Sequence, residues 1–153
     1  MADRIAVMDA GQIVQLGSGE EIYRQPNCRY VADFIGEANL LPCIVAADGG
    51  LRLEAGDVPL PYEAKDAAGG RATLLVRPED MGLGDGPGEA DCVSLPATVR
   101  DVVFVGSSTR VYARTEAGAE LLLSGAGAER ERLEPGRTIV AHWRRSAGCV
   151  LVR

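Results

Sequence analysis

Residues 94–115, "SLPATVRDVVFVGSSTRVYART", have the pattern of two consecutive β-strands separated by a short break. The first strand is a long, mostly apolar run, and it ends at the Gly-Ser-Ser sequence of residues 106–108. After the break, the side chains of residues 110–113 alternate along the chain, as they do in a strand with one buried face. The stretch therefore predicts β-structure in the middle of the chain.

The same pattern of short apolar runs and Gly-rich turns extends in both directions from this stretch. Further runs cover residues 73–76, 138–143 and 150–152, and turns fall at residues 48–50 and 117–118. From Asn39 onward the chain therefore predicts about eight or nine short strands at a spacing of roughly 8 to 12 residues. This spacing is typical of a small β-barrel or sandwich, so we expect a mainly β fold.

The beginning of the chain has a different pattern. Two apolar runs at residues 4–8 and 13–16 flank an Asp-Ala-Gly-Gln turn, which predicts a β-hairpin. Ser18 and Glu21 then form the S-x-x-E signature of a capping box, in which each side chain bonds the backbone N–H of the other residue. We therefore expect a short helix over residues 19–24.

A second helix is predicted over residues 28–36, "CRYVADFIG", with Asn27 as its N-cap and Gly36 as its end. Its apolar residues fall on one stripe, and they are Tyr30, Val31, Phe34 and Ile35. Helical patterning stops there, so we expect a domain of residues 1–37 followed by a β domain of residues 38–153.

The charge counts against nucleic-acid binding, and the lysine content counts against a phosphate-binding loop. The formal net charge of the chain is −6, which lacks the electrostatic footprint of nucleic-acid binding. A phosphate-binding P-loop needs Gly-Lys-Ser/Thr, because the lysine must reach the phosphates. Lys65 is the sole lysine, and it lies in "EAKDA" without that context. We therefore expect no Walker A loop and no catalytic residue in this chain.

The histidine and cysteine content gives no sign of a metal centre. His142 is the one histidine, within a predicted strand, and a packed strand histidine is the simpler interpretation. The four cysteines form no closely spaced pair, so neither a zinc site nor a redox pair is predicted. We therefore expect no metal and no cofactor in this chain.

Two polar clusters are candidates for binding. In "VRPED", residues 76–80, Pro78 can start a single helical turn with Glu79 and Asp80 near its N–H groups. This cluster is either a capped turn or a contact with a partner subunit or small ligand. In "VGSSTR", residues 105–110, the bend with Ser107 and Ser108 is either a strand corner or a small-oxyanion site. The candidate oxyanion ligands are Arg77, Ser107, Ser108 and Arg110.

The motifs "ADRI", "M-x-x-G-x-I-x-Q-x-G" and "E-I-Y-x-x-P" occur in this order near the start of the chain, and "FIGEANLLPC" follows them. With these motifs, residues 2–42 resemble the C-terminal end of the nucleotide-binding subunit of an ABC importer of the polyamine, iron, phosphonate, sulfate or sugar type, and "FIGEANLLPC" resembles the linker that follows it. The later segments "LLVRPEDMGL", "VRDVVFVGSSTRVYART" and "GRTIVAHW" resemble the appended TOBE domain, an OB-like β-barrel. Gly19 and Cys43 depart from the family pattern, which tends to have Pro and Gly there.

The resemblance implies the following expectations. Residues 1–37 are the remnant of an α/β ATPase domain whose Walker and signature motifs would precede residue 1, so the chain is a fragment or the product of a truncated gene. In the full-length parent, ATP and Mg serve a homodimeric ATPase that drives membrane permease subunits on the cytoplasmic side of the inner membrane. The β-barrel is a regulatory and dimerising module. The apolar side chains of residues 1–35 lack their native cover, so we expect self-association, with strand exchange as one route.

Two alternatives stay open from the sequence. One is a stand-alone barrel that binds a small oxyanion such as molybdate, sulfate or phosphonate. The other is an OB-type nucleic-acid binder, which needs a basic groove and exposed stacking aromatics. The negative charge and the single Trp count against the second.

Overall fold

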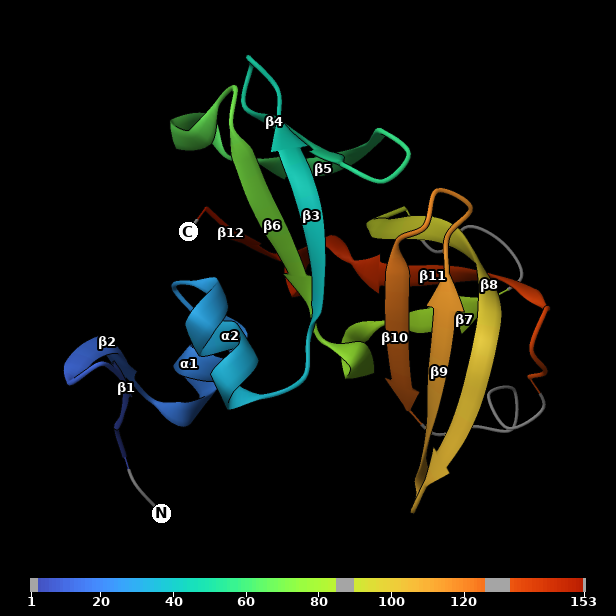
Figure 1. The fold of residues 1–153 in the computed structure, drawn as a ribbon, viewed down its shortest axis with the longest axis horizontal. Helices are drawn as coiled ribbons and strands as arrows, with labels where there is room; N and C mark the ends of the chain where they lie inside the picture. Colours follow the sequence, from blue (N-terminus) through green and yellow to red (C-terminus); the bar gives the residue numbers. More distant parts are fainter. Residues whose placement is uncertain (1–2, 85–89, 126–132, 153) are drawn as a thin grey trace.

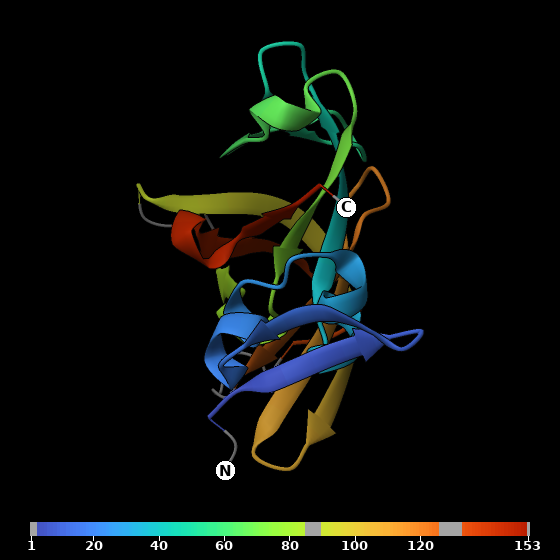
Figure 2. The ribbon, with the colours of Figure 1, turned by 90° about the vertical axis from the view of Figure 1, so that its left-hand side faces the viewer.

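The computed structural model describes residues 3–84, 90–125 and 133–152 (Figure 1). Within these residues the fold is mainly β, with one two-stranded sheet and two five-stranded sheets. The two-stranded sheet and two short helices form one end of the molecule, and the two larger sheets form the rest (Figures 1 and 2). The expectation of a mainly β fold is therefore confirmed.

The N-terminal hairpin and the first helix form as the sequence predicts. Strands β1 (Ile5–Asp9) and β2 (Gln12–Gly17) pair antiparallel around a turn in which Ala10 and Gly11 both have positive φ. Such a two-residue turn matches the twist of the strands it joins. Helix α1 (Gly19–Arg24) begins with the full capping box, since the Glu21 N–H donates to Ser18 Oγ at 3.1 Å and the Ser18 N–H donates to Glu21 Oε2 at 2.8 Å.

The second helix, α2 (Arg29–Ile35), ends at Gly36 as expected, but the prediction of its N-cap is wrong. Its N-cap is Cys28, and the Asn27 side chain instead donates to Val14 O of the hairpin at 2.7 Å. The rest of the chain covers only part of the predicted apolar stripe. Val31 and Ala32 are buried, whereas Tyr30 is 40% and Phe34 is 65% exposed.

The first large sheet has the strand order β12-β6-β3-β4-β5, and each described pair in it is antiparallel. Its strands are β3 (Asn39–Val45), β4 (Gly50–Leu53), β5 (Val58–Glu63), β6 (Arg71–Val76) and β12 (Cys149–Leu151). Strand β12 comes from the end of the chain, so the last residues return to the sheet that the linker began.

The second large sheet has the order β10-β9-β8-β11-β7 and is also antiparallel. Its strands are β7 (Gly82–Gly84), β8 (Cys92–Val105), β9 (Ser108–Arg114), β10 (Glu120–Gly125) and β11 (Thr138–Arg144). The stretch that predicted β-structure is the β8–β9 hairpin, with its turn at Gly106 and Ser107. The strand expected over residues 138–143 is β11.

The two large sheets share one hydrophobic core. Buried side chains of both sheets belong to the same cluster, with Leu53 and Leu74 from the first and Val111 and Trp143 from the second. The indole N–H of Trp143 donates to the Tyr62 hydroxyl at 3.2 Å, which links β11 to β5 within this core. In the part of the chain that the structure describes, no helix is both long and apolar enough to cross a membrane.

Candidate functional site

The Arg77 side chain joins the N-terminal segment to the large sheets. Arg77 directly follows β6 and is only 2% exposed. Its Nη1 donates to the carbonyl oxygens of Glu37 at 2.9 Å, Gly36 at 3.2 Å and Ala32 at 3.3 Å. Its Nη2 donates to the carbonyl oxygen of Tyr23 at 2.9 Å. We call this set of contacts the Arg77 joint.

The accepting carbonyls explain why a buried cation is stable here. Ala32, Gly36 and Tyr23 lie in or just after the last turns of α1 and α2, where carbonyls lack helical partners and the helix dipole is negative. A planar guanidinium carries several N–H groups in a fixed fork, so one side chain can satisfy several carbonyls. The Arg77 guanidinium also lies over the Tyr23 ring, 4.2 Å from its centroid. Its Nε is buried without a hydrogen-bond partner among the described residues.

The acidic residues after Arg77 contact the same N-terminal segment. Pro78–Asp80 forms the single helical turn that the sequence predicts. The Tyr23 hydroxyl donates to Glu79, and the Arg24 guanidinium lies 3.6 Å from the Asp80 carboxylate. Burial, together with the bond to Glu79, raises the pKa of Tyr23 to about 12. Burial also raises the pKa of Asp80, while the nearby charge of Arg24 opposes that shift.

The linker between the two parts is fixed to the second sheet as well. Arg110 of β9 forms an ion pair with Glu37 at 2.6 Å. The buried side chain of Asn39 accepts from the Leu122 N–H at 2.7 Å and donates to the Leu122 carbonyl at 2.9 Å. Residues 37–39 therefore bond to β6, β9 and β10, and the N-terminal segment is linked to both large sheets.

The structure distributes the four predicted oxyanion ligands over two places. Arg77 is buried in the joint, and Arg110 is already compensated by Glu37. Ser107 and Ser108 lie at the turn of the β8–β9 hairpin, where Ser108 Oγ donates to Val105 O at 3.3 Å. The two arginines therefore meet at Glu37, and neither serine hydrogen-bonds to them in the described part of the chain. Glu79 and Asp80 contact their own chain, and a contact of theirs with a partner subunit stays a prediction.

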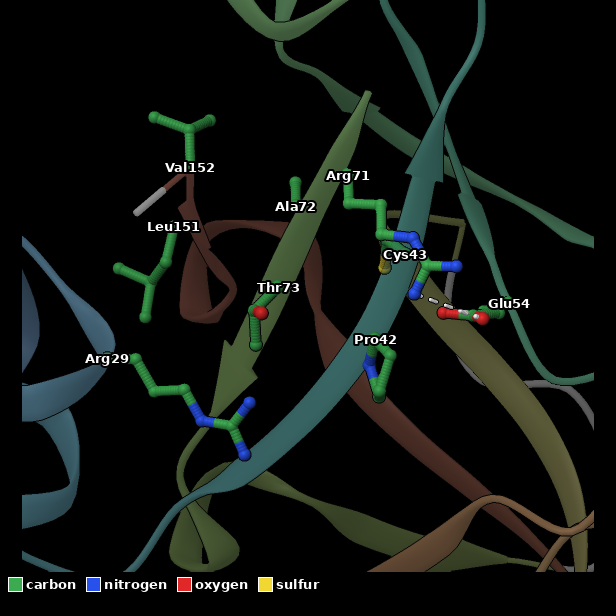
Figure 3. Close-up of a pocket in the computed structure, with 9 residues that line it drawn as sticks. All are labelled: Arg29, Pro42, Cys43, Glu54, Arg71, Ala72, Thr73, Leu151 and Val152. Carbon is green, nitrogen blue, oxygen red and sulfur yellow. Dashed lines mark ion pairs between the residues drawn. The ribbon is translucent and has the colours of Figure 1, made fainter. Parts of the chain in front are cut away.

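A different pair of arginines lines an open pocket on the first sheet (Figure 3). The cavity measures about 360 Å³, and Arg29, Arg71, Thr73 and Glu54 give it its polar lining. Arg71 lies 3.5 Å from Glu54, and both are exposed, as is Arg29. Sequence reasoning missed this pocket because Arg29 belongs to the N-terminal segment and Arg71 to β6. No local motif connects the two residues.

Comparison with known proteins identifies the family. Residues 74–151 match the family model of the TOBE domain. The chain belongs to the TOBE domain family. This stretch runs from within β6 to the end of β12, so the match includes the residue that forms the Arg77 joint.

Curated relatives match most of the chain. The spermidine/putrescine import ATP-binding protein PotA of Ruegeria pomeroyi is 43% identical over 128 residues, covering 80% of this chain and 33% of that protein. PotA of Acidothermus cellulolyticus is 33% identical, covering 99% of this chain and 42% of that protein. The sulfate/thiosulfate import ATP-binding protein CysA 2 of Chromobacterium violaceum is 39% identical, covering 91% of this chain and 38% of that protein. The chain thus spans less than half the length of these relatives, and the predicted resemblance to ABC importer ATP-binding subunits is confirmed.

A solved structure supports the TOBE fold. The cytoplasmic molybdate-binding protein ModG, determined with molybdate bound, matches with a TM-score of 0.62. The alignment covers 75% of this chain and 96% of that chain, at 18% sequence identity. At this identity the likeness shows the fold, and the OB-like TOBE fold expected from the sequence is confirmed.

Proposed function

We propose that the chain is a regulatory and dimerising module of an ABC importer ATP-binding subunit. In the full-length parent, the nucleotide-binding part would use ATP and Mg to drive permease subunits at the cytoplasmic face of the inner membrane. The relatives support this context, since they are named as ATP-binding proteins for import. The observation that carries the regulatory role is the Arg77 joint, because it fixes residues 1–37 to the TOBE region.

The proposed mechanism is a bias between two states of the parent subunit. A module influences an equilibrium by the difference between its affinities for the two states. Residues 1–37 would move with the nucleotide-binding part, and residues 38–153 would form the regulatory domain. The joint contains charge-assisted hydrogen bonds from Arg77 to several carbonyls. Because these bonds hold the helices to Arg77, a displacement of α1 or α2 would also move Arg77 and the adjoining strand β6.

The surface of residues 1–35 supports an association with another protein body. Six large apolar side chains on it are exposed, and they are Ile5, Met8, Ile13, Leu16, Tyr30 and Phe34. We call these six residues together the N-terminal apolar face, with Ile5 and Leu16 on opposite sides of the β1–β2 hairpin. Burying one such side chain contributes about 1.5–3 kcal/mol, so a partner that covers the face gains stability. For the isolated chain, a second copy of the chain would be this partner. The two-stranded sheet has open edges at which two copies would exchange strands.

A fusion protein tests the proposed function. The nucleotide-binding part of the Ruegeria relative would be joined to the start of this chain, and ATP-driven dimerisation and ATP hydrolysis would be measured with and without residues 38–153. We expect both fusions to hydrolyse ATP, and removal of residues 38–153 to shift the ATP concentration at half-maximal dimerisation at least threefold. Identical dimerisation curves for the two fusions would overturn the regulatory role.

A second candidate function is the binding of a small oxyanion. It is favoured by the pocket of Arg29 and Arg71, because guanidinium groups bind oxyanions with bidentate geometry, and by the fold likeness to a molybdate-binding protein. Calorimetry with molybdate, sulfate and phosphonate would be compared for the native chain, an Arg29→Ala/Arg71→Ala variant and a Ser107→Ala/Ser108→Ala variant. Loss of binding in the first variant alone would assign the pocket, and loss in the second alone would assign the hairpin bend. No heat with any anion would exclude this candidate.

A further inference from the structure

The β8–β9 hairpin extends beyond the sheet to which it belongs. Strand β11 pairs with β8 from Cys92 to Thr98, and farther along β8 the described strand pairs are with β9 alone. The extension ends at Val103, Phe104 and Val105, which are 38%, 63% and 50% exposed. We call these three residues the hairpin tip.

The hairpin tip is an unfavourable surface to leave in water. Successive side chains of a strand point to opposite faces, so Phe104 and its two valine neighbours make both faces of the tip apolar. One such side chain gains about 1.5–3 kcal/mol when it is fully buried. Three consecutive apolar side chains are exposed at the end of β8, and such a patch indicates a contact with another protein body.

The position of the hairpin tip relates it to the N-terminal apolar face. Figure 1 shows β1 and the β8–β9 hairpin at opposite ends of the long axis of the molecule, and in both views the hairpin tip points toward the lower side, where β1 also lies (Figures 1 and 2). The ion pair between Arg110 and Glu37, 2.6 Å long, ties the hairpin to the linker. A body that covers the N-terminal apolar face and extends along this lower side would reach the hairpin tip.

We propose that the hairpin tip docks on the nucleotide-binding part of an ATP-binding subunit, as a second contact beside the N-terminal apolar face. This inference rests on the proposed function. The relatives have more than half of their length outside the part that matches this chain. This unmatched part is long enough to form the domain on which the hairpin tip would dock. They are named ATP-binding proteins, whereas this chain has no lysine-containing phosphate loop, so their nucleotide-binding part lies in the unmatched portion. Through Arg110 and Glu37, the tip contact would then reach the Arg77 joint.

Photo-cross-linking in the same fusion protein tests the proposal. A benzophenone amino acid would replace Phe104, and the matched control would carry it at Ile44, which is 43% exposed on β3. We expect cross-linked peptides from the nucleotide-binding part at position 104, with at least a tenfold higher yield than at position 44. Cross-links from position 104 to a second hairpin, or the absence of cross-links at this position, would overturn the proposal.

A substitution separates the docking contact from a folding effect. Phe104→Ser lies on an exposed tip, so the thermal unfolding midpoint should stay within about 2 °C of the native value. In the fusion protein we expect this variant to shift the ATP dependence of dimerisation at least twofold in the same direction as deletion of residues 38–153. If the deletion shifts dimerisation and Phe104→Ser does not, the docking proposal fails and the regulatory function stands. If neither shifts it, the regulatory function fails.

Discussion

At the scale of single residues, Arg77 has the largest structural role that the sequence did not predict. It was a candidate ligand for an anion, yet its guanidinium binds backbone carbonyls of its own chain. The neighbouring Glu79 and Asp80 act on the same segment through Tyr23 and Arg24. The "VRPED" motif is therefore an internal connection in this structure.

Replacement of Arg77 by Met should lower the free energy of unfolding by about 3 kcal/mol, because several buried carbonyls lose a charged donor. Arg77→Lys should recover only part of this loss, since an ammonium cannot reproduce the fork. Urea unfolding would measure both. Arg114→Ala is the control, because its pair with Glu120 is exposed and should cost less than about 1 kcal/mol. A loss for Arg77→Met no larger than this control would contradict the role of the joint.

The raised pKa of Tyr23 predicts that the stability of the folded chain falls at alkaline pH. Its pKa in the folded chain is about 12, above the ordinary value of 10.0, so the folded state holds the phenolic proton more tightly than the unfolded state does. The resulting stability is fully present below pH 10 and is lost as the pH rises through about 12. Urea unfolding between pH 9 and about pH 12 should show this decline, and Tyr23→Phe should show a smaller one. Equal pH slopes for the two proteins would exclude the Tyr23 hydroxyl as the source.

At the scale of elements, the β1–β2 hairpin and α2 show how local patterning and burial diverge. Both form where the sequence predicts them, yet Tyr30 and Phe34 of α2 face outward and stack at 6.1 Å between ring centroids. Val31 and Ala32 are the side chains of this helix that the fold buries. The helix period identified an apolar stripe, but the neighbouring elements in this chain cover only part of it.

Self-association through the N-terminal apolar face is the prediction at this scale. An Ile13→Lys/Phe34→Ser variant replaces two exposed side chains and should weaken association at least tenfold, with little change in the thermal unfolding midpoint. Sedimentation velocity over a concentration series would measure it. The control is Ile44→Lys, an exposed apolar position on β3. A native chain that sediments as a monomer at high concentration would contradict the prediction.

At the scale of the whole molecule, two five-stranded sheets with one core carry a smaller N-terminal segment. The last strand, β12, follows the strands of the second sheet along the chain and pairs with β6 of the first sheet. The chain connection and these hydrogen bonds join the two sheets. Residues 37–39 then connect the segment to both sheets. This arrangement is the structural basis of the proposed regulatory role.

The corresponding prediction is that this chain alone hydrolyses no ATP. The reason is chemical, because its one lysine lacks the glycine and hydroxyl context of a phosphate loop. A phosphate-release assay on protein purified by two independent affinity steps would measure turnover. Turnover that remains constant through both steps and follows the protein peak would refute the prediction.

Features that depend on neighbouring residues could be predicted from the sequence. The capping box of Ser18 and Glu21, the β8–β9 hairpin and the helical turn at Pro78 are encoded within a few positions, and each is present in the structure. The family resemblance was also readable, because its motifs in residues 2–42 are contiguous. The roles of Arg77, Arg110 and Asn39 could not be predicted in this way, because they depend on the three-dimensional fold. Their partners are 40 or more positions away along the chain, and such pairs form only when the whole core has brought the elements together.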